Sequence, residues 1–203
     1  METRETEIMK RFVTFEGIDG SGKSTIAQHV YRKLSEQGYP VVLTVEPTTS
    51  DLGVFVKHCI TTHADPFVTA FAFIADRINH CRDIQRWLDE QKIVLCDRYA
   101  ESTYAYQGVQ LEPHLKKPIV WLKELSKNRI LTPTRTYYLD IDPELALRRI
   151  QTRPERIPFE QYDFLKKVQK NYQKICRGRR FSILDATEPI DVLTEQCVSD
   201  ILK

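Results

Sequence analysis

The 203-residue chain, of which 41% is hydrophobic, is long enough to form one α/β domain with a full core. Its 30 basic and 28 acidic side chains nearly balance, which argues against a nucleic-acid partner and leaves only local basic patches. Five scattered cysteines without a C-x-x-C pair and no apolar run of ~20 residues exclude a zinc ribbon, a disulfide scaffold and a membrane span, so we expect a cytoplasmic protein.

The first ten residues, METRETEIMK, are charged and contain no apolar segment like that of a signal peptide. We interpret residues 1–10 as an N-terminal extension and expect a single domain over residues 11–203. The β-branched and aromatic run RFVTF at 11–15 predicts the first strand. Residues 17–24 then fit the phosphate-binding pattern G-x-x-x-x-G-K-[ST], and helical spacing follows over residues 25–37. Because such a loop functions between a strand and a helix, this context predicts binding of a nucleoside triphosphate.

The residue types of this loop suit a phosphate ligand. Its glycines let successive backbone N–H groups turn toward phosphate oxygens, where a side chain would block the approach. Lys23 would bring positive charge to the β- and γ-phosphates, and Ser24 would offer a hydroxyl to Mg²⁺. The residues expected to bind the triphosphate are Gly17, Ile18, Asp19, Gly20, Ser21, Gly22, Lys23, Ser24 and Thr25.

Strand-like and helix-like segments alternate along the rest of the chain. Short apolar runs at residues 41–45, 93–97, 136–141 and 181–186 predict four more strands. Helical spacing predicts helices over about 67–90, 143–151, 160–177 and 189–202. In the longest of them, one face is formed by Phe71, Ile74, Ile78 and Leu88, with charged residues opposite. The alternation predicts an α/β fold, the three-layer P-loop NTPase fold, with a five-stranded, mostly parallel, doubly wound sheet and helices on both faces.

Ligands of such sheets gather at the carboxyl ends of the strands, so the residues that follow each strand are candidates for the site. Glu46 follows the second strand, and Asp97 and Arg98 come at the end of the third. After the fourth strand, four arginines fall within nine residues: Arg148, Arg149, Arg153 and Arg156. An isolated cluster of this kind would be a solvated helix end. Behind the fourth strand of a phosphate-loop protein, it predicts a basic lid over about 148–160 that closes over the triphosphate and excludes water.

With these landmarks in order, the chain resembles the thymidylate kinase family from Arg11 to its C-terminus. The matching segments are FEGIDGSGKST, EPTTS, FAFIADRINH, DRYAESTYAYQG and YLDIDPELALRRIQTRPER, followed by FEQYDFLKKVQKNY. DRY followed by S-x-x-A-Y-Q-G is the most specific of them. The resemblance implies phosphoryl transfer from ATP with Mg²⁺ to thymidine 5′-monophosphate (dTMP), giving dTDP for dTTP biosynthesis, in a homodimer. The catalytic residues it implies are Lys23, Asp19, Asp97, Arg98, Arg149, Arg153 and Arg156.

By the same resemblance, Asp19 accepts a hydrogen bond from the 3′-hydroxyl of dTMP; taken alone, it could instead close an Asx-turn in the loop. Arg98 would hold the 5′-phosphate, since a guanidinium fork can bind two phosphate oxygens at once. A surface ion pair is the alternative for Arg98. Asp97 would hold Mg²⁺ through water or position the reacting phosphate.

The base would be recognised by the long helix and by the segment after DRY. Phe73 and Arg77 lie four residues apart, hence on one helix face. The resemblance implies that Phe73 stacks on the thymine ring and that Arg77 bonds its carbonyl edge, although Phe73 alone would be read as core packing. The other expected substrate-binding residues are Glu46, Ser102 and Gln107, with Tyr106 beside the sugar carbon that lacks a hydroxyl in DNA precursors.

Two departures from the family pattern concern charge, and a third concerns an aromatic residue of the lid. Val45 stands where many members carry arginine, Gly20 stands where one branch carries a catalytic arginine, and Ile157 lies near the place of a lid tyrosine. The catalytic arginine should therefore come from the lid, and we rank Arg153 and Arg149 ahead of Arg156.

Other readings compete with a thymidylate kinase. A kinase of another nucleoside monophosphate remains open, and a deoxynucleoside kinase would usually show E-R-S where this chain has DRY. A GTPase-like nucleotide-binding switch would need an N-K-x-D sequence, which this chain lacks, and a D-x-x-G motif after the phosphate loop, where none follows. A degenerate kinase that binds without turnover is the fourth reading, and the intact Lys23, Asp97 and Arg98 argue against it.

Overall fold

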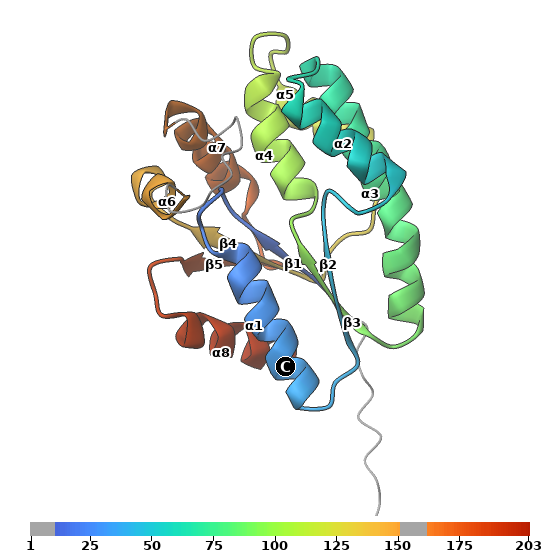
Figure 1. Ribbon diagram of the computed structural model, residues 1–203, viewed down its shortest axis with the longest axis vertical. Helices are drawn as coiled ribbons and strands as arrows, with labels where there is room; N and C mark the ends of the chain where they lie inside the picture. Colours follow the sequence, from blue (N-terminus) through green and yellow to red (C-terminus); the bar gives the residue numbers. More distant parts are fainter. Residues whose placement is uncertain (1–10, 151–161) are drawn as a thin grey trace, which may run out of the picture.

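In the computed structural model, which describes residues 11–150 and 162–203, five strands form one parallel sheet in the order β2-β3-β1-β4-β5 (Figure 1). The strands are β1 (Phe12–Glu16), β2 (Val41–Val45), β3 (Ile93–Asp97), β4 (Arg135–Asp140) and β5 (Phe181–Asp185). Each predicted strand is confirmed to within one residue at either end. Every pairing in this sheet is parallel, so the expected α/β class is confirmed.

The central strand β1 places the phosphate loop in the middle of the sheet. It pairs with β3 on one side and β4 on the other, and all five of its residues are buried. Burial of a polar side chain requires a partner, and Thr14 finds one in the Thr136 hydroxyl of β4 at 2.8 Å. The loop that follows β1 is therefore held by a strand that cannot shift without disturbing both neighbours.

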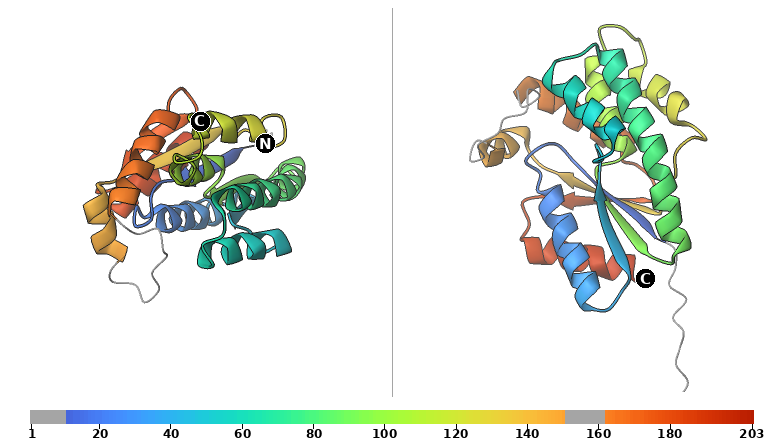
Figure 2. Two further views of the ribbon diagram at one scale, coloured as in Figure 1. Left: turned by 90° about the horizontal axis from the view of Figure 1, so that it is seen from above. Right: turned by 45° about the vertical axis from the view of Figure 1, so that its right-hand side comes forward.

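Helices cover both faces of the sheet. They are α1 (Lys23–Glu36), α2 (Asp51–Thr61), α3 (Pro66–Asp89), α4 (Ala100–Gln110), α5 (Pro118–Ser126), α6 (Pro143–Ile150), α7 (Tyr162–Ile175) and α8 (Ile190–Ile201). Helices α1 and α8 pack together on one face, while α3, α4 and α7 cover the other, as right-handed crossovers require (Figures 1 and 2). Helix α2 packs on the outer side of α3. None of the helices in the described part of the chain is both long and apolar enough to cross a membrane.

The sequence pattern missed three helices, α2, α4 and α5. Helix α4 shows why: every residue from Ala100 to Val109 is buried, so the segment AESTYAYQGV has no polar face and no helical stripe to detect. The predicted helices at 143–151 and 160–177 are observed as α6 and α7 within the described residues, and residues 151–161 lie outside them. The same holds for the proposed extension at residues 1–10.

The predicted apolar face of α3 is only partly correct, because Leu88 is partly buried against the core and Ile74 is buried, but the other two residues are exposed. Phe71 and Ile78 are 50% and 37% exposed, whereas Ile74 is buried. The buried stripe runs through Ala70, Ile74, Arg77, His80 and Ile84 at spacings of three and four residues. Two polar side chains, Arg77 and His80, therefore occupy core positions, and the buried face is turned around the helix from the one that apolar residues alone suggest, with Ile74 common to both.

Candidate active site

The phosphate loop forms as its sequence predicts. Gly17, Gly20 and Gly22 all have positive φ, and the loop closes through a hydrogen bond from the Ser21 N–H to the Ile18 carbonyl at 3.1 Å. Helix α1 begins at Lys23, so its free N–H groups and positive end lie at the loop. The Lys23 ammonium is buried and donates to the Ile18 carbonyl at 3.4 Å. The geometry is that of an anion site at a helix N-terminus.

Gly20 is glycine because helix α6 leaves no room for a side chain. A Cβ at this position would lie 2.3 Å from the carbonyl oxygen of Ala146 and 2.9 Å from its carbon. An arginine at position 20 would therefore displace α6. The absence of a loop arginine in the sequence thus has a steric reason in this fold.

Asp19, a residue of the phosphate loop, forms an ion pair with Arg98, and both side chains line the neighbouring cavity. The other Asp19 oxygen accepts a hydrogen bond from the Tyr106 hydroxyl at 2.9 Å, and that hydroxyl in turn accepts one from the Asp19 N–H. Burial alone would raise the pKa of Asp19, but the charges of Arg98 and Lys23 outweigh it and lower this pKa to about 2. The carboxylate is therefore ionised, and each of its oxygens has a partner.

Arg98 lies in the left-handed region, at φ 70°, directly after strand β3. From there its guanidinium reaches back to the loop, donating to the Ser102 hydroxyl at 3.1 Å and to the Gly17 carbonyl at 3.4 Å. Ser102 also donates to Glu16, so its hydroxyl supports the Arg98 network in addition to lining the cavity. A non-glycine residue held at positive φ next to a phosphate loop is typical of functional positions.

Glu16, which the sequence analysis did not single out, holds this region together. Its carboxylate accepts hydrogen bonds from the Tyr99 N–H at 2.8 Å, the Ser102 hydroxyl at 2.6 Å and the Tyr172 hydroxyl at 3.0 Å. Burial and the neighbouring Glu101 raise the pKa of Glu16 to about 7. Its signal in the sequence was slight: a lone acid at the last position of a buried central strand.

One cavity beside the loop brings together six of the eight predicted substrate-binding residues: Asp19, Phe73, Arg98, Ser102, Tyr106 and Gln107. Pro47 and Ile60 complete its lining. Because these residues come from the phosphate loop, α3 and the β3–α4 segment, only the folded chain joins them. A guanidinium, an aromatic ring and a side-chain amide thus line one cavity beside the phosphate loop.

The remaining two predicted residues, Glu46 and Arg77, are buried as an ion pair with an N–O distance of 2.7 Å. Arg77 donates through Nε to Glu46 and through Nη2 to the Tyr99 carbonyl and the Thr103 hydroxyl, each at 3.0 Å. Within the described residues, its third nitrogen, Nη1, and the Gln107 Oε1 atom are buried without a hydrogen-bond partner. An unpaired buried donor and an unpaired buried acceptor are costly unless a ligand completes them.

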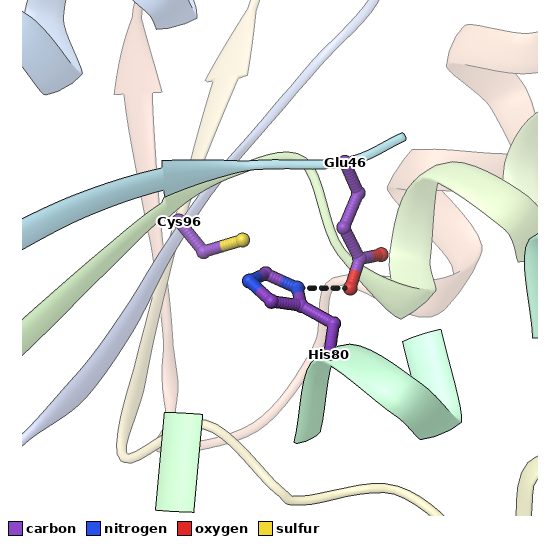
Figure 3. Close-up of side chains that lie close together, drawn as sticks. All are labelled: Glu46, His80 and Cys96. Atoms are coloured by element: carbon purple, nitrogen blue, oxygen red, sulfur yellow. Dashed lines mark hydrogen bonds and ion pairs between the residues drawn. The ribbon is translucent and has the colours of Figure 1, made fainter. Parts of the chain in front are cut away.

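Glu46, His80 and Cys96 present three potential metal-ligand atoms within 4.8 Å of one another (Figure 3). Their atoms are already engaged: His80 bonds Glu46 at 2.9 Å and Thr44 at 2.8 Å, and the Cys96 thiol donates to the Arg98 carbonyl at 3.0 Å. Burial raises the pKa of the Cys96 thiol well above its ordinary value, which disfavours the thiolate that a metal needs. The cluster is a hydrogen-bond network beside a cation.

Oxygen atoms suited to a hard cation occur at the loop instead. Asp97 ends β3 and its Oδ1 is buried without a partner within the described residues, while Ser24 is exposed in the first turn of α1. Carboxylate and hydroxyl oxygens are the ligand types that Mg²⁺ accepts. The two residues expected from the sequence to meet Mg²⁺ therefore fit it chemically.

The arginine cluster is described only as far as Ile150. Arg148 is exposed and pairs with Glu144 at 2.5 Å, as on a solvated helix end. Arg149 instead donates to the Ala186 carbonyl at 3.0 Å and so joins α6 to the loop after β5. The other two arginines of the predicted lid, Arg153 and Arg156, lie outside the described residues.

Asp76 and His80 on α3 are further residues that the sequence analysis missed. Asp76 accepts hydrogen bonds from the Thr48 N–H at 2.8 Å and hydroxyl at 2.5 Å and from the Ser50 hydroxyl at 3.1 Å. Helix α3 thereby holds the loop after β2. The sequence signal that could have indicated these residues is the group of polar and charged residues in ADRINH, on the same helix face as Ala70 and Ile84.

The known proteins to which this chain is similar include thymidylate kinases. A family model described as thymidylate kinase matches residues 15–197. The chain is similar to a probable thymidylate kinase of Methanosarcina barkeri, with 36% identity over 95% of this chain and 96% of that protein. It is also similar to a probable thymidylate kinase of Sulfurisphaera tokodaii, with 38% identity over 95% of this chain and 96% of that protein. A thymidylate kinase of Coprothermobacter proteolyticus is 33% identical over 94% of this chain and 98% of that protein.

Proposed function

The chain belongs to the thymidylate kinase family, and from this premise we propose that it transfers the γ-phosphoryl group of ATP to dTMP, giving ADP and dTDP on the route to dTTP. The observation that carries the proposal is the cavity that joins six predicted substrate residues to the phosphate loop. Donor and acceptor phosphates would meet between Lys23 and Arg98, the two cations on either side of Asp19.

The chemistry needs positioning and charge stabilisation, with no covalent intermediate on the protein. Lys23 and the loop N–H groups hold the donor phosphates, and Arg98 holds the phosphate of dTMP so that its oxygen attacks in line. Asp19 accepts a hydrogen bond from the 3′-hydroxyl, and the Tyr106 ring excludes a 2′-hydroxyl by clash. Arginines of the lid, Arg149 among them, stabilise the charge that grows on the transferred group.

Ser24 and Asp97 are the residues that would hold the Mg²⁺ that accompanies ATP, Asp97 through water; the alternative for Asp97 is to position the reacting phosphate. When bound, the ion would neutralise charge on the β- and γ-phosphates. The support from this chain is the exposed Ser24 hydroxyl and the unpaired Asp97 oxygen.

Recognition of the base rests on two buried atoms without a partner within the described residues, one on Arg77, four residues after the cavity-lining Phe73, and one on Gln107, which lines the cavity itself. Arg77 Nη1 is a donor and Gln107 Oε1 an acceptor, which complement the 4-carbonyl oxygen and the N3–H group of thymine. Phe73 lines the same cavity and offers a ring for stacking on the base. A buried site of this kind rejects a base that leaves either group unpaired.

An ADP-release assay with ATP, Mg²⁺ and a panel of nucleoside monophosphates tests the proposal. We expect turnover with dTMP and close analogues and little with UMP, CMP or AMP. Turnover with UMP or CMP alone would assign the chain to another monophosphate kinase. Binding of ATP and dTMP without ADP release would support the degenerate-kinase reading.

We further propose a homodimer formed through the exposed apolar side chains of α2 and α3. Phe55 on α2 and Phe71 on α3 are 46% and 50% exposed, and Val54, Val68 and Ile78 are exposed on the same two helices. Sedimentation velocity tests this: Phe71→Glu should give monomers, whereas the control Ile183→Glu on edge strand β5 should not. A wild-type monomer would refute it.

We also propose a cytoplasmic location. The five cysteines, none of which forms a disulfide, support it, because free thiols persist in a reducing compartment.

A further inference from the structure

A buried chain of hydrogen bonds runs from strand β2 to the guanidinium of Arg77. It passes from the Thr44 hydroxyl to His80 Nε2 (2.8 Å), from His80 Nδ1 to Glu46 Oε1 (2.9 Å) and from Glu46 Oε2 to Arg77 Nε (2.7 Å). His80, Glu46 and Arg77 are each at most 3% exposed. Figure 3 shows the imidazole of His80 between the Glu46 carboxylate and Cys96.

The hydrogen-bond partners of the two ring nitrogens fix how the His80 imidazole is oriented and which nitrogen carries a proton. A carboxylate only accepts hydrogen bonds, so the imidazole must carry a proton on Nδ1 and donate it to Glu46. The opposite nitrogen is held by Thr44, and the Trp87 ring lies edge-on at 6.2 Å. The ring is therefore fixed at both ends, and it fixes one of the two Glu46 oxygens in turn.

The second oxygen of Glu46 determines how Arg77 lies. It accepts from Nε, while Nη2 donates to the Tyr99 carbonyl and the Thr103 hydroxyl. Because the guanidinium is planar, these contacts fix the direction of Nη1, the nitrogen left without a partner within the described residues. Rotation of the Glu46 carboxylate would move this donor with it.

We propose that His80 is a positioning residue that sets selectivity for the base by holding Glu46, and through it Arg77 Nη1, in place. The proposal rests on the assignment of Arg77 to the base under the proposed function. A fixed N–H donor donates to the 4-carbonyl oxygen of thymine and opposes the 4-amino group of cytosine, which is itself a donor. A guanidinium free to turn would discriminate less between them.

Two substitutions separate the positioning role from a general structural one. In His80→Asn, the amide nitrogen can take the place of Nδ1 and still donate to Glu46. In His80→Gln, the amide lies near the place of Nε2, so the contact with Thr44 can survive while Glu46 loses its donor. Both variants lose the imidazole ring, so a role in packing alone would affect them alike or in the order of their stabilities.

Steady-state kinetics with dTMP and ATP, and calorimetric titration with dTMP and dCMP, give the readout. For His80→Gln we expect the KM for dTMP to rise about tenfold or more, since a hydrogen bond to a charged group is lost. The KM for ATP and kcat should stay within about threefold, and the ratio of dTMP to dCMP affinity should fall. His80→Asn should remain within about threefold of wild type in all four.

The result that overturns the inference is a folded His80→Gln enzyme with wild-type KM for dTMP and wild-type preference over dCMP. Equal losses in both variants, following their thermal stabilities, would also overturn it. If His80→Gln does not fold, Thr44→Val decides: a raised KM for dTMP supports the inference and an unchanged KM refutes it. A wild-type enzyme inactive on dTMP would instead refute the proposed function itself, so the two failures are distinct.

Discussion

Replacing Arg98 with alanine should remove the hold on the 5′-phosphate of dTMP while leaving the ATP site intact. The side chain is 18% exposed and its guanidinium pairs with Asp19, Ser102 and the Gly17 carbonyl. Truncating one member of a largely buried charge pair costs about 2–5 kcal/mol. This range corresponds to a loss of about 30- to 5,000-fold in dTMP affinity.

The backbone should tolerate the change. Arg98 already has a positive φ of 70°, and alanine bears a similar cost there, so strain is nearly equal in both proteins. Arg98→Lys serves as the matched variant, because it keeps the charge but cannot reproduce the two-nitrogen fork. We expect its affinity for dTMP to lie between those of wild type and Arg98→Ala.

Calorimetric titration with dTMP, thymidine and ATP separates the phosphate contact from a general defect. The ratio of dTMP to thymidine affinity reports the phosphate alone, and it should collapse in Arg98→Ala. A defect in the fold would lower the affinities for dTMP, thymidine and ATP together and leave that ratio unchanged. Such an outcome would mean that Arg98 supports the fold and does not bind the phosphate.

Three further predictions follow from the site. Gly20→Ala should lower kcat/KM for ATP at least about tenfold, because the added Cβ meets the backbone of Ala146. The control Gly38→Ala has a similar positive φ but open space around the Cβ, so it should lose stability without a change in kinetics. Equal kinetics in the two variants would refute the idea that Gly20 is required because of the close approach of α6. Glu16 has a pKa raised from 4.5 to about 7, so folding favours its protonated form, and this stabilisation is lost as pH rises through that range. Denaturant titrations at several pH values should show this loss in wild type and not in Glu16→Gln, and parallel curves would contradict it. The last concerns the arginines of the predicted lid: Arg149, Arg153 and Arg156. Replacing all three with alanine should abolish turnover but preserve the affinity for dTMP. Among the single variants, one should lose roughly 10³-fold in kcat. A triple variant whose kcat stays within about tenfold of wild type would refute the predicted lid.

The sheet and the phosphate loop could be predicted because their signals are contiguous. Each strand is a short apolar run, and the loop pattern lies between a strand and a helix, so local sequence carries both. Helix α4 could not be predicted in this way, because it is buried on every side and its pattern has no period. Six of the eight residues that line the cavity were identified through resemblance, since Phe73 and Gln107 meet only in the folded chain.

Helix α3 shows a different limit. Hydrophobic residues alone place Phe71 and Ile78 on the core face, but the core face carries Arg77 and His80. A buried charge is costly unless it is paired, and its partner Glu46 lies more than thirty residues away, at the end of β2. No local pattern contains that pairing, so the periodicity of apolar residues in α3 cannot indicate that Arg77 and His80 lie on its buried face.

Asp19 is the residue whose presence is hardest to explain from sequence, because a carboxylate in an anion-binding loop should repel phosphate. In the structure, this carboxylate also acts on the electrostatics of the two neighbouring cations, Lys23 and Arg98. Burial and the charge of Arg98 lower the pKa of Lys23 to about 8, so the two cations oppose one another. Asp19 lies between them, bonded to Arg98 and 3.6 Å from the Lys23 ammonium, and its charge offsets part of this effect. An acid at this position therefore allows two cations to remain charged side by side, as the phosphates of two substrates require.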